Sequence, residues 1–188
     1  FKGTPRRGVG EAAAAIEAAG GDLNAWTSWD ETCFHATLEA EEVHEALDVV
    51  FDMAGGALLD AGEIEREKQV VIEEIRGYDD DPDSVAADRM HALLFGSHPY
   101  GRPVIGWAHT VNNMDRPVVE GFWRRNYHPG RAVLSIAGPV DIDAVEAELR
   151  PWLARWPGGD GRTAIPRING AGRASVERLD RDFGSVVV

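Results

Sequence analysis

Two glutamates seven residues apart, Glu67 and Glu74, are the side chains in this sequence whose spacing most suggests chemistry. They lie in a run, residues 63–78, whose apolar positions recur with the spacing of a helix. At about 100° per residue, both glutamates fall within roughly 60° of Val71, the centre of the predicted apolar stripe. The other members of that stripe are Ile64, Ile75 and Tyr78. A carboxylate in an apolar seam is costly unless a cation, a proton or a metal compensates it. The pattern therefore suggests a site at Glu67 and Glu74, whereas Glu73 points the opposite way and is expected to be solvated.

The same pattern has a simpler interpretation. Glutamates at the border of an apolar stripe often extend toward solvent or pair with a lysine or arginine of a neighbouring element. Periodicity alone leaves both interpretations open.

Composition excludes several classes of partner. The chain has 188 residues and a formal net charge of −13, with 32 acidic and 19 basic residues. A nucleic-acid backbone or an anionic membrane surface requires a basic patch, so neither is expected as a partner. No apolar stretch approaches the roughly 18 to 20 residues of a membrane-spanning helix. The single cysteine, Cys33, excludes an internal disulfide framework.

The order of the predicted elements indicates an α+β fold, with a mixed or antiparallel sheet packed against helices. A short turn joins two strand-like runs, residues 22–28 and 31–38, into a predicted antiparallel hairpin. A third strand is predicted at residues 131–137. Helical patterns occupy residues 8–19, 41–53, 60–78, 82–95, 115–127 and 141–156. Asp60 is predicted to cap the third of these helices. The chain begins at Phe1 without a methionine and ends in an apolar run, so we expect that it is truncated at both ends.

Five segments of the chain resemble the M16 metallopeptidases, the family of insulinase, pitrilysin and the mitochondrial processing peptidase. They occur in the family's order and near its spacing, and they read FKGT (1–4), GGDLNAWTS (20–28), EREKQVVIEEIRGYDDDP (65–82), FGSHPYGRPVIG (95–106) and NYHP followed by VLSIAGPVD (126–141). The resemblance implies that residues 1–160 are most of a first M16 peptidase domain, without its N-terminal strand and zinc-motif helix. Residues 161–172 would then be a linker, and residues 173–188 the first strand of a second M16-like domain.

The resemblance also implies a zinc site to which this chain contributes only part. The family uses an inverted His-x-x-Glu-His motif, in which two histidines bind Zn²⁺ and the glutamate is the general base. The motif typically stands immediately before a segment like FKGT, so the histidines and the base would lie upstream of Phe1. No catalytic residue is therefore expected in this chain, and none of its six histidines is assigned to zinc. Glu74 matches the distal metal ligand, and Glu67 matches an acidic residue that supports the ligands without binding the metal itself.

Asn24, Ala25 and Trp26 resemble the part of a strand that pairs with extended peptide substrates in relatives. An exposed strand edge offers unmade backbone hydrogen bonds to any peptide. The simpler interpretation is that these residues merely belong to a sheet.

We therefore expect the intact parent to be a zinc-dependent endopeptidase that hydrolyses peptides or small unfolded proteins in a chamber, and the 188-residue chain itself to be inactive. The expected partners are a peptide or unfolded polypeptide and a second M16-like domain or subunit. One alternative is a non-catalytic M16-like partner or structural core subunit, and another is a peptide-binding module unrelated to the family. The sequence does not choose between cytoplasm and periplasm.

Overall fold

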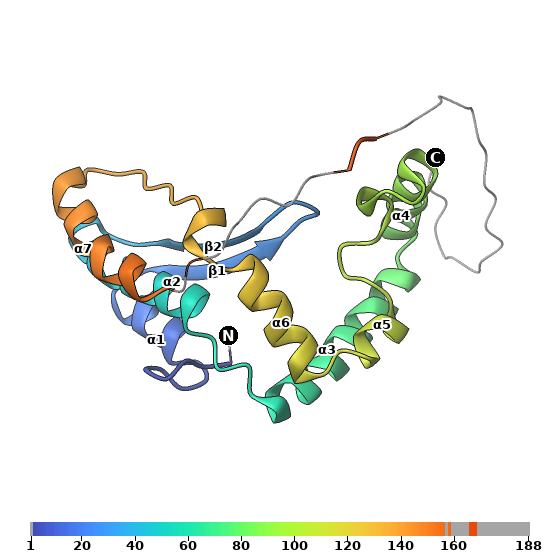
Figure 1. Cartoon of the computed structure of the whole chain (residues 1–188), viewed down its shortest axis with the longest axis horizontal. Coiled ribbons are helices and arrows are strands. Elements are labelled where there is room, and N and C mark those ends of the chain that lie inside the picture. The colour runs from blue at the N-terminus through green and yellow to red at the C-terminus, as the bar shows by residue number, and fades with distance from the viewer. Residues whose placement is uncertain (1, 157, 159–165, 169–188) are drawn as a thin grey trace. The chain divides into compact units, whose positions relative to one another are not determined.

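The structure is a computed structural model that describes residues 2–156, 158 and 166–168 (Figure 1). It divides into two compact units, which are considered separately. The first comprises Phe1–Thr27, Glu31–Ile64 and Asp115–Thr163, and the second comprises Ser28–Asp30, Glu65–Met114 and Ala164–Val188. Helices and a two-stranded antiparallel sheet make up the described structure, so the predicted α+β class is confirmed.

The first unit is built around a hairpin and a central helix. Its elements are α1 (Glu11–Ala18), β1 (Asp22–Thr27), β2 (Thr32–Thr37), η1 (Ala40–Glu42), α2 (Val43–Gly55), α6 (Arg116–Asn126), η3 (Pro129–Arg131) and α7 (Ile142–Arg155). The register of the hairpin pairs Asp22 with Thr37 and Thr27 with Thr32, which confirms the predicted hairpin. The chain turns from α1 into β1 at Gly21, where a Cβ would lie 2.6 Å from the Thr37 carbonyl oxygen. Only glycine fits this close approach.

Helix α2 is apolar on two faces and joins two cores. One face buries Val49 and Met53 against α1 and the hairpin. The other buries Leu47 and Phe51 against Val145 of α7. Because α2 contacts both layers, it is the element that the rest of the first unit packs around.

Tryptophan N–H groups tie the chain to backbone carbonyls in this unit. Trp123 of α6 donates through Nε1 to the Ala54 carbonyl at the end of α2, at 3.0 Å. Trp156, just after α7, donates in the same way to the Tyr127 carbonyl at 3.0 Å. Each bond satisfies a polar group that would otherwise be costly to bury among apolar side chains.

The second unit consists of helices and shaped loops. Its elements are most of α3 (Ala61–Asp80), α4 (Pro82–Phe95), η2 (Pro99–Gly101) and α5 (Ala108–Asn112). The helix predicted to start at Pro82 runs as expected to Phe95, with the Asp81 side chain accepting from the Ser84 N–H at 3.0 Å. The short helix α5 was not predicted, because five residues are too few to show a helical period.

The strand predicted at residues 131–137 is wrong. Residues 132–137 belong to no helix or strand, and Val133 is 96% exposed. An apolar run shows that a segment could be buried as a strand. It does not supply the neighbouring strand whose backbone groups must complete the hydrogen bonds.

Most of the predicted linker at residues 161–172 and all of the predicted strand at residues 173–188 lie outside the described residues, so the domain boundaries stay a prediction. In the part of the chain that the structure describes, no helix combines the length and the apolar composition needed to cross a bilayer.

The two-sided packing of α2 predicts a large difference between two identical substitutions. Val49→Ala removes two methyl groups from a fully buried side chain (0% exposed), whereas Val133→Ala does so at a 96% exposed one. We expect Val49→Ala to lower the free energy of unfolding by about 2 to 3 kcal/mol, and Val133→Ala to change it by less than about 0.5 kcal/mol. Urea denaturation of the 188-residue chain measures both values. Equal losses would contradict the packing described for α2.

Candidate functional site

Helix α3 carries both glutamates of the predicted metal site. It begins after Asp60, whose Oδ1 accepts from the backbone N–H three residues later at 3.0 Å, so the predicted cap is confirmed. Ion pairs one turn apart cover part of its surface, namely Lys68 with Glu65 and Arg76 with Glu73. Glu73 is therefore a solvent-facing partner, as the sequence predicts.

The buried face of α3 overlaps the predicted stripe only in part: Ile75 and Val71 belong to both, but Ile72, which the stripe leaves out, is buried as well. Ile72 and Ile75 are buried against Val111 of α5, whereas Tyr78 is 52% exposed. The centre of the buried face therefore lies about 70° around the helix from Val71, on the side away from the two glutamates. The physical reason for this rotation is that the apolar residues of α3 pack against α5 and the loop before it, and this contact determines which face of α3 is buried. A stripe drawn from spacing alone has no such information.

Glu67 and Glu74 share a side of α3 that differs from the buried one. At about 100° and 1.5 Å per residue they lie roughly 20° apart around the axis and about 10 Å apart along it. Glu74 is exposed and Glu67 is half-buried. The expectation that both carboxylates lie in a buried apolar seam is therefore wrong for Glu74 and met only in part by Glu67. The part of the prediction that holds is that Glu67 and Glu74 point in nearly the same direction from the helix axis.

The described residues do not by themselves make a metal centre. Within residues 2–156, 158 and 166–168, no group of three His, Cys, Asp or Glu side chains is placed to hold a metal ion. A catalytic zinc ion takes three protein ligands and keeps a fourth position open. The carboxylates of Glu67 and Glu74 have the right donor chemistry for such a site, but they need ligands from elsewhere to complete it.

The histidines occupy varied surroundings. His98 is buried, and its Nδ1 accepts from the Tyr100 N–H at 3.2 Å while its Nε2 lies 2.9 Å from the Pro166 carbonyl oxygen. His98 therefore holds the loop after α4 by hydrogen bonds. His91 is half-buried and stacked on Trp29, with ring centroids 4.2 Å apart.

Strand β1 places the three predicted peptide-binding residues on the hairpin. Asn24, Ala25 and Trp26 pair with His35, Phe34 and Cys33 of β2. The other edge of β1 has no partner strand among the described residues. The Asn24 Oδ1 accepts from the Ala25 N–H at 2.8 Å, so a side chain occupies this backbone donor in the structure. Trp26 is exposed.

The turn between the strands belongs to the second unit and is held by polar contacts. Trp29 donates through Nε1 to the Arg102 carbonyl at 2.8 Å. The Tyr100 hydroxyl donates to Asp30 Oδ1 at 2.5 Å. The hydrogen bond to this carboxylate raises the pKa of Tyr100, because it stabilises the protonated phenol and opposes a second negative charge beside Asp30.

Comparison with known proteins decides the family. Residues 1–107 match the profile described as "Insulinase (Peptidase family M16)", and residues 113–184 match the one described as "Peptidase M16 inactive domain". This chain belongs to the M16 peptidase family. The first match contains both Glu67 and Glu74, and it contains the predicted peptide-binding strand.

Curated relatives of this M16 chain are much longer than it is. A Mycobacterium tuberculosis protein named "Uncharacterized zinc protease" is 40% identical over 187 residues, covering 97% of this chain and 43% of the relative. A protein of Arabidopsis thaliana named "Probable mitochondrial-processing peptidase subunit beta, mitochondrial" is 33% identical over 150 residues, covering 80% of this chain and 28% of the relative. This M16 chain thus spans less than half the length of these relatives.

Solved structures agree with the fold. A protease from Helicobacter pylori superimposes with a TM-score of 0.81 at 26% identity, over 89% of this chain and 40% of that one. The first half of the periplasmic protease PqqL from Escherichia coli superimposes with a TM-score of 0.75 at 21% identity, over 88% and 37%. The second of these likenesses concerns the fold alone.

A buried polar network surrounds Asp52 and was not predicted from the sequence; Thr4 and Arg7 form it with further carboxylates of α2. A signal was present. Asp48 and Asp52 lie four residues apart on a predicted helix, which places both on one side of it, and the chain has an Arg-Arg pair just after FKGT.

The raised pKa of Tyr100 yields a spectroscopic prediction. Asp30→Asn removes the negative charge that opposes phenolate formation, so the pKa of Tyr100 should fall toward the ordinary tyrosine value of about 10. Ultraviolet absorbance of the phenolate, followed during alkaline titration with Tyr100→Phe to assign the signal, measures the change. An unaltered titration in Asp30→Asn would contradict the contact between Asp30 and Tyr100.

Proposed function

We propose that the intact parent of this chain is a zinc-dependent endopeptidase that hydrolyses peptides or small unfolded proteins in a chamber. The observation that carries the proposal is the pair Glu67 and Glu74 on one side of α3, within residues 1–107 that match the insulinase profile. The name "zinc protease" on a 40% identical relative supports it. Because this chain covers 43% of that relative, the activity belongs to the longer parent.

In this proposal Glu74 is the third protein ligand of the zinc ion. Its carboxylate is exposed on a regular helix, so it is open to a metal ion and to ligands that other residues supply. A bound zinc ion would lower the pKa of a water molecule and polarise the scissile carbonyl. The general base is also assigned to upstream residues, so this chain contributes coordination and no proton transfer.

Glu67 acts on the ligands in the proposal, not on the metal. It lies two turns before Glu74 on the same side of α3 and is half-buried. A carboxylate at such a distance can hold a ligand histidine in the correct tautomer and orientation by accepting its second ring N–H.

Strand β1 is the proposed peptide-binding edge. The edge of β1 that has no partner strand among the described residues offers backbone groups to an extended substrate, which would allow binding with little demand on side chains. The Asn24 side chain would have to release the Ala25 N–H before a peptide carbonyl could accept from it. Trp26 is exposed and offers an aromatic surface to the same peptide.

One observation favours a second candidate function. The profile matched by residues 113–184 is described as an inactive domain, and a non-catalytic M16-like subunit would still bind peptides or protein partners through β1. The two candidates differ in whether the Glu74 carboxylate matters, because only the peptidase needs a metal ligand there.

Three matched glutamine substitutions in the full-length parent test the role of α3. Glu74→Gln should lower both zinc content and kcat/KM by more than about 100-fold, and Glu67→Gln should lower kcat/KM by about 10- to 100-fold. Glu73→Gln, next to Glu74 but paired with Arg76 on another side of the helix, is the control and should leave both unchanged. Zinc content is measured by atomic emission, and kcat/KM with a quenched fluorescent peptide. If Glu74→Gln behaves like Glu73→Gln, the non-catalytic candidate is the better one.

The 188-residue chain alone should hydrolyse no peptide, because the proposal assigns two zinc ligands and the general base to residues upstream of Phe1. The same quenched peptide, incubated with the chain and an equimolar amount of zinc, provides the measurement. Hydrolysis that a chelator abolishes would show that these residues hold a complete site, and would overturn the assignment of two ligands and the base to upstream residues.

A further inference from the structure

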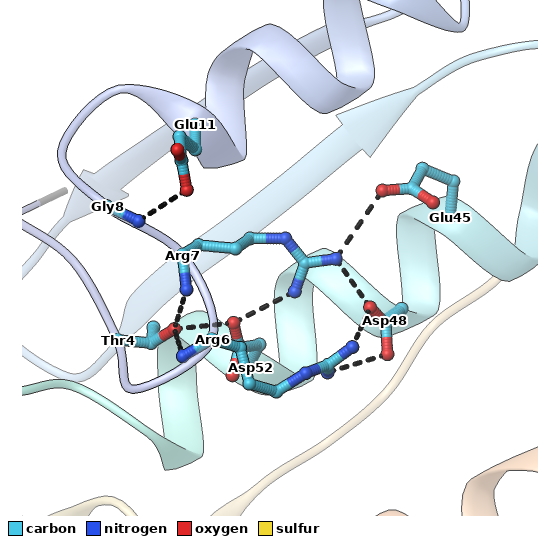
Figure 2. A network of polar contacts seen from close by, with 8 residues as sticks. All are labelled: Thr4, Arg6, Arg7, Gly8, Glu11, Glu45, Asp48 and Asp52. Atoms are coloured by element: carbon cyan, nitrogen blue, oxygen red, sulfur yellow. Dashed lines mark hydrogen bonds and ion pairs between the residues drawn. The ribbon is translucent and has the colours of Figure 1, made fainter.

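A buried carboxylate organises the first residues of the chain. Asp52 of α2 is 3% exposed. Its Oδ2 accepts from Thr4 Oγ1 at 2.7 Å and from Arg7 Nη1 at 2.9 Å (Figure 2). Removing water from a carboxylate is costly, and only a close cation and well-directed donors compensate that cost. If Thr4 and Arg7 moved away, the Asp52 carboxylate would be left buried without a partner or would have to become exposed to water. We call Thr4, Arg7 and Asp52 the Asp52 clamp.

Two further carboxylates of α2 hold the arginine of the clamp in place. The Arg7 side chain is 13% exposed, and its Nη2 lies 2.5 Å from Asp48 and 3.5 Å from Glu45. With Asp52, these carboxylates lie along one side of α2 at successive turns, as Figure 2 shows. Burial alone would raise the pKa of Asp48, but hydrogen bonds from Arg6 and Arg7 outweigh it and hold that pKa below its ordinary value. Asp48 is therefore ionised at neutral pH and paired with both arginines.

The clamp also fixes the backbone of residues 3–7. The Thr4 hydroxyl accepts from the N–H groups of Arg6 at 3.1 Å and Arg7 at 3.0 Å, and the Thr4 N–H donates to the Arg7 carbonyl at 2.8 Å. Gly3 has φ of +98°, which favours glycine, and its carbonyl accepts from the Leu58 N–H at 3.2 Å. One side chain, Thr4, thus closes the turn and joins it to the buried charge.

We propose that the Asp52 clamp is a positioning device that sets the direction in which the chain enters Gly3, and with it the placement of the residues immediately before. The inference rests on the proposed function, in which those residues carry two zinc ligands and the general base. Ligands must be held within about 0.5 Å of productive geometry, and a short connection to a mobile surface loop would not do so. Thr4 and Asp52 are positioning residues, because they touch neither metal nor substrate.

The exposed contact of Arg6 shows why the buried contacts of Asp52 with Thr4 and Arg7, and not the surrounding charges in general, fix the turn. Arg6 makes a two-pronged ion pair with Asp48, at 2.8 and 2.7 Å, and its guanidinium lies 5.0 Å from the centroid of the Trp152 ring. The Arg6 side chain is nevertheless 47% exposed, so water can replace its partners. Arg6 supports the network, whereas Thr4 and Arg7 fasten the turn.

The test uses variants of Thr4 in the full-length parent. Thr4→Val keeps the shape of the side chain and removes the hydroxyl, and Thr4→Ser keeps the hydroxyl. The apparent zinc dissociation constant is measured by chelator competition, the melting temperature on the metal-free protein, and kcat at saturating zinc. We expect Thr4→Val to weaken zinc binding by about 10- to 100-fold, the range found when groups that orient metal ligands are removed, and to lower kcat. Thr4→Ser should restore both to within about threefold.

A matched control separates positioning from stability. Val49→Ala weakens the core on the same helix without removing any hydrogen-bonding group of the clamp, since Val49 is an apolar residue that is fully buried against α1 and the hairpin. It should lower the melting temperature of the metal-free parent at least as much as Thr4→Val, yet leave the zinc dissociation constant within about threefold.

Two results overturn the positioning role. One is a zinc dissociation constant that Thr4→Val leaves unchanged in a parent that binds zinc. The other is a shift that Val49→Ala reproduces at equal loss of melting temperature, which would make the clamp merely structural. A wild-type parent that binds no zinc would instead contradict the proposed function itself, and the positioning role would fail with it.

Discussion

The compensation of one buried negative charge, that of Asp52, is the constraint on which the first unit depends. Its carboxylate stands at the end of α2, the helix that packs on α1 and the hairpin with one face and on α7 with the other. Breaking a buried ion pair by removing one partner costs about 3 to 5 kcal/mol, so Thr4 and Arg7 are held there as firmly as a core side chain. The turn that follows Gly3 in the FKGT segment is thereby joined to α2, the helix that contributes to both cores.

Helix α3 differs from α2 in this respect, because neither carboxylate of the proposed site is fully buried: Glu74 is exposed and Glu67 is half-buried. The apolar contact of Ile72 and Ile75 with Val111 fixes how the helix is rotated, and Glu67 and Glu74 consequently share another side. A metal ligand must face the metal and not the core of its own unit. In the proposed peptidase, burial of Glu74 would come with the arrival of the ion and its other ligands, which explains how an exposed glutamate and a ligand role are compatible.

Elements defined by local chemistry could be predicted from the sequence, and elements defined by a distant partner could not. The hairpin, the cap at Asp60 and the helix starting at Pro82 each depend on residues within a few positions of one another, and each was predicted. The strand at residues 131–137 and the rotation of α3 depend on what lies alongside. The prediction of the strand was wrong, and the predicted face of α3 was met only in part. The clamp at Asp52 was missed for a related reason: Thr4 and Asp52 are 48 positions apart, and periodicity describes only one element at a time. For the site, the sequence alone singles out Glu67 and Glu74, although the physical reason it offers, a buried seam, does not hold for Glu74.

The most direct test of the central claim, that α3 supplies a zinc ligand to an M16 peptidase, is a crystal structure of the full-length parent with data collected at the zinc absorption edge. We predict an anomalous peak about 2.0 to 2.2 Å from a Glu74 carboxylate oxygen, with the hydrogen bond between Thr4 and Asp52 intact. A zinc peak with Glu74 outside coordination distance, or a parent that crystallises from zinc-containing solution with no metal near α3, would contradict the account.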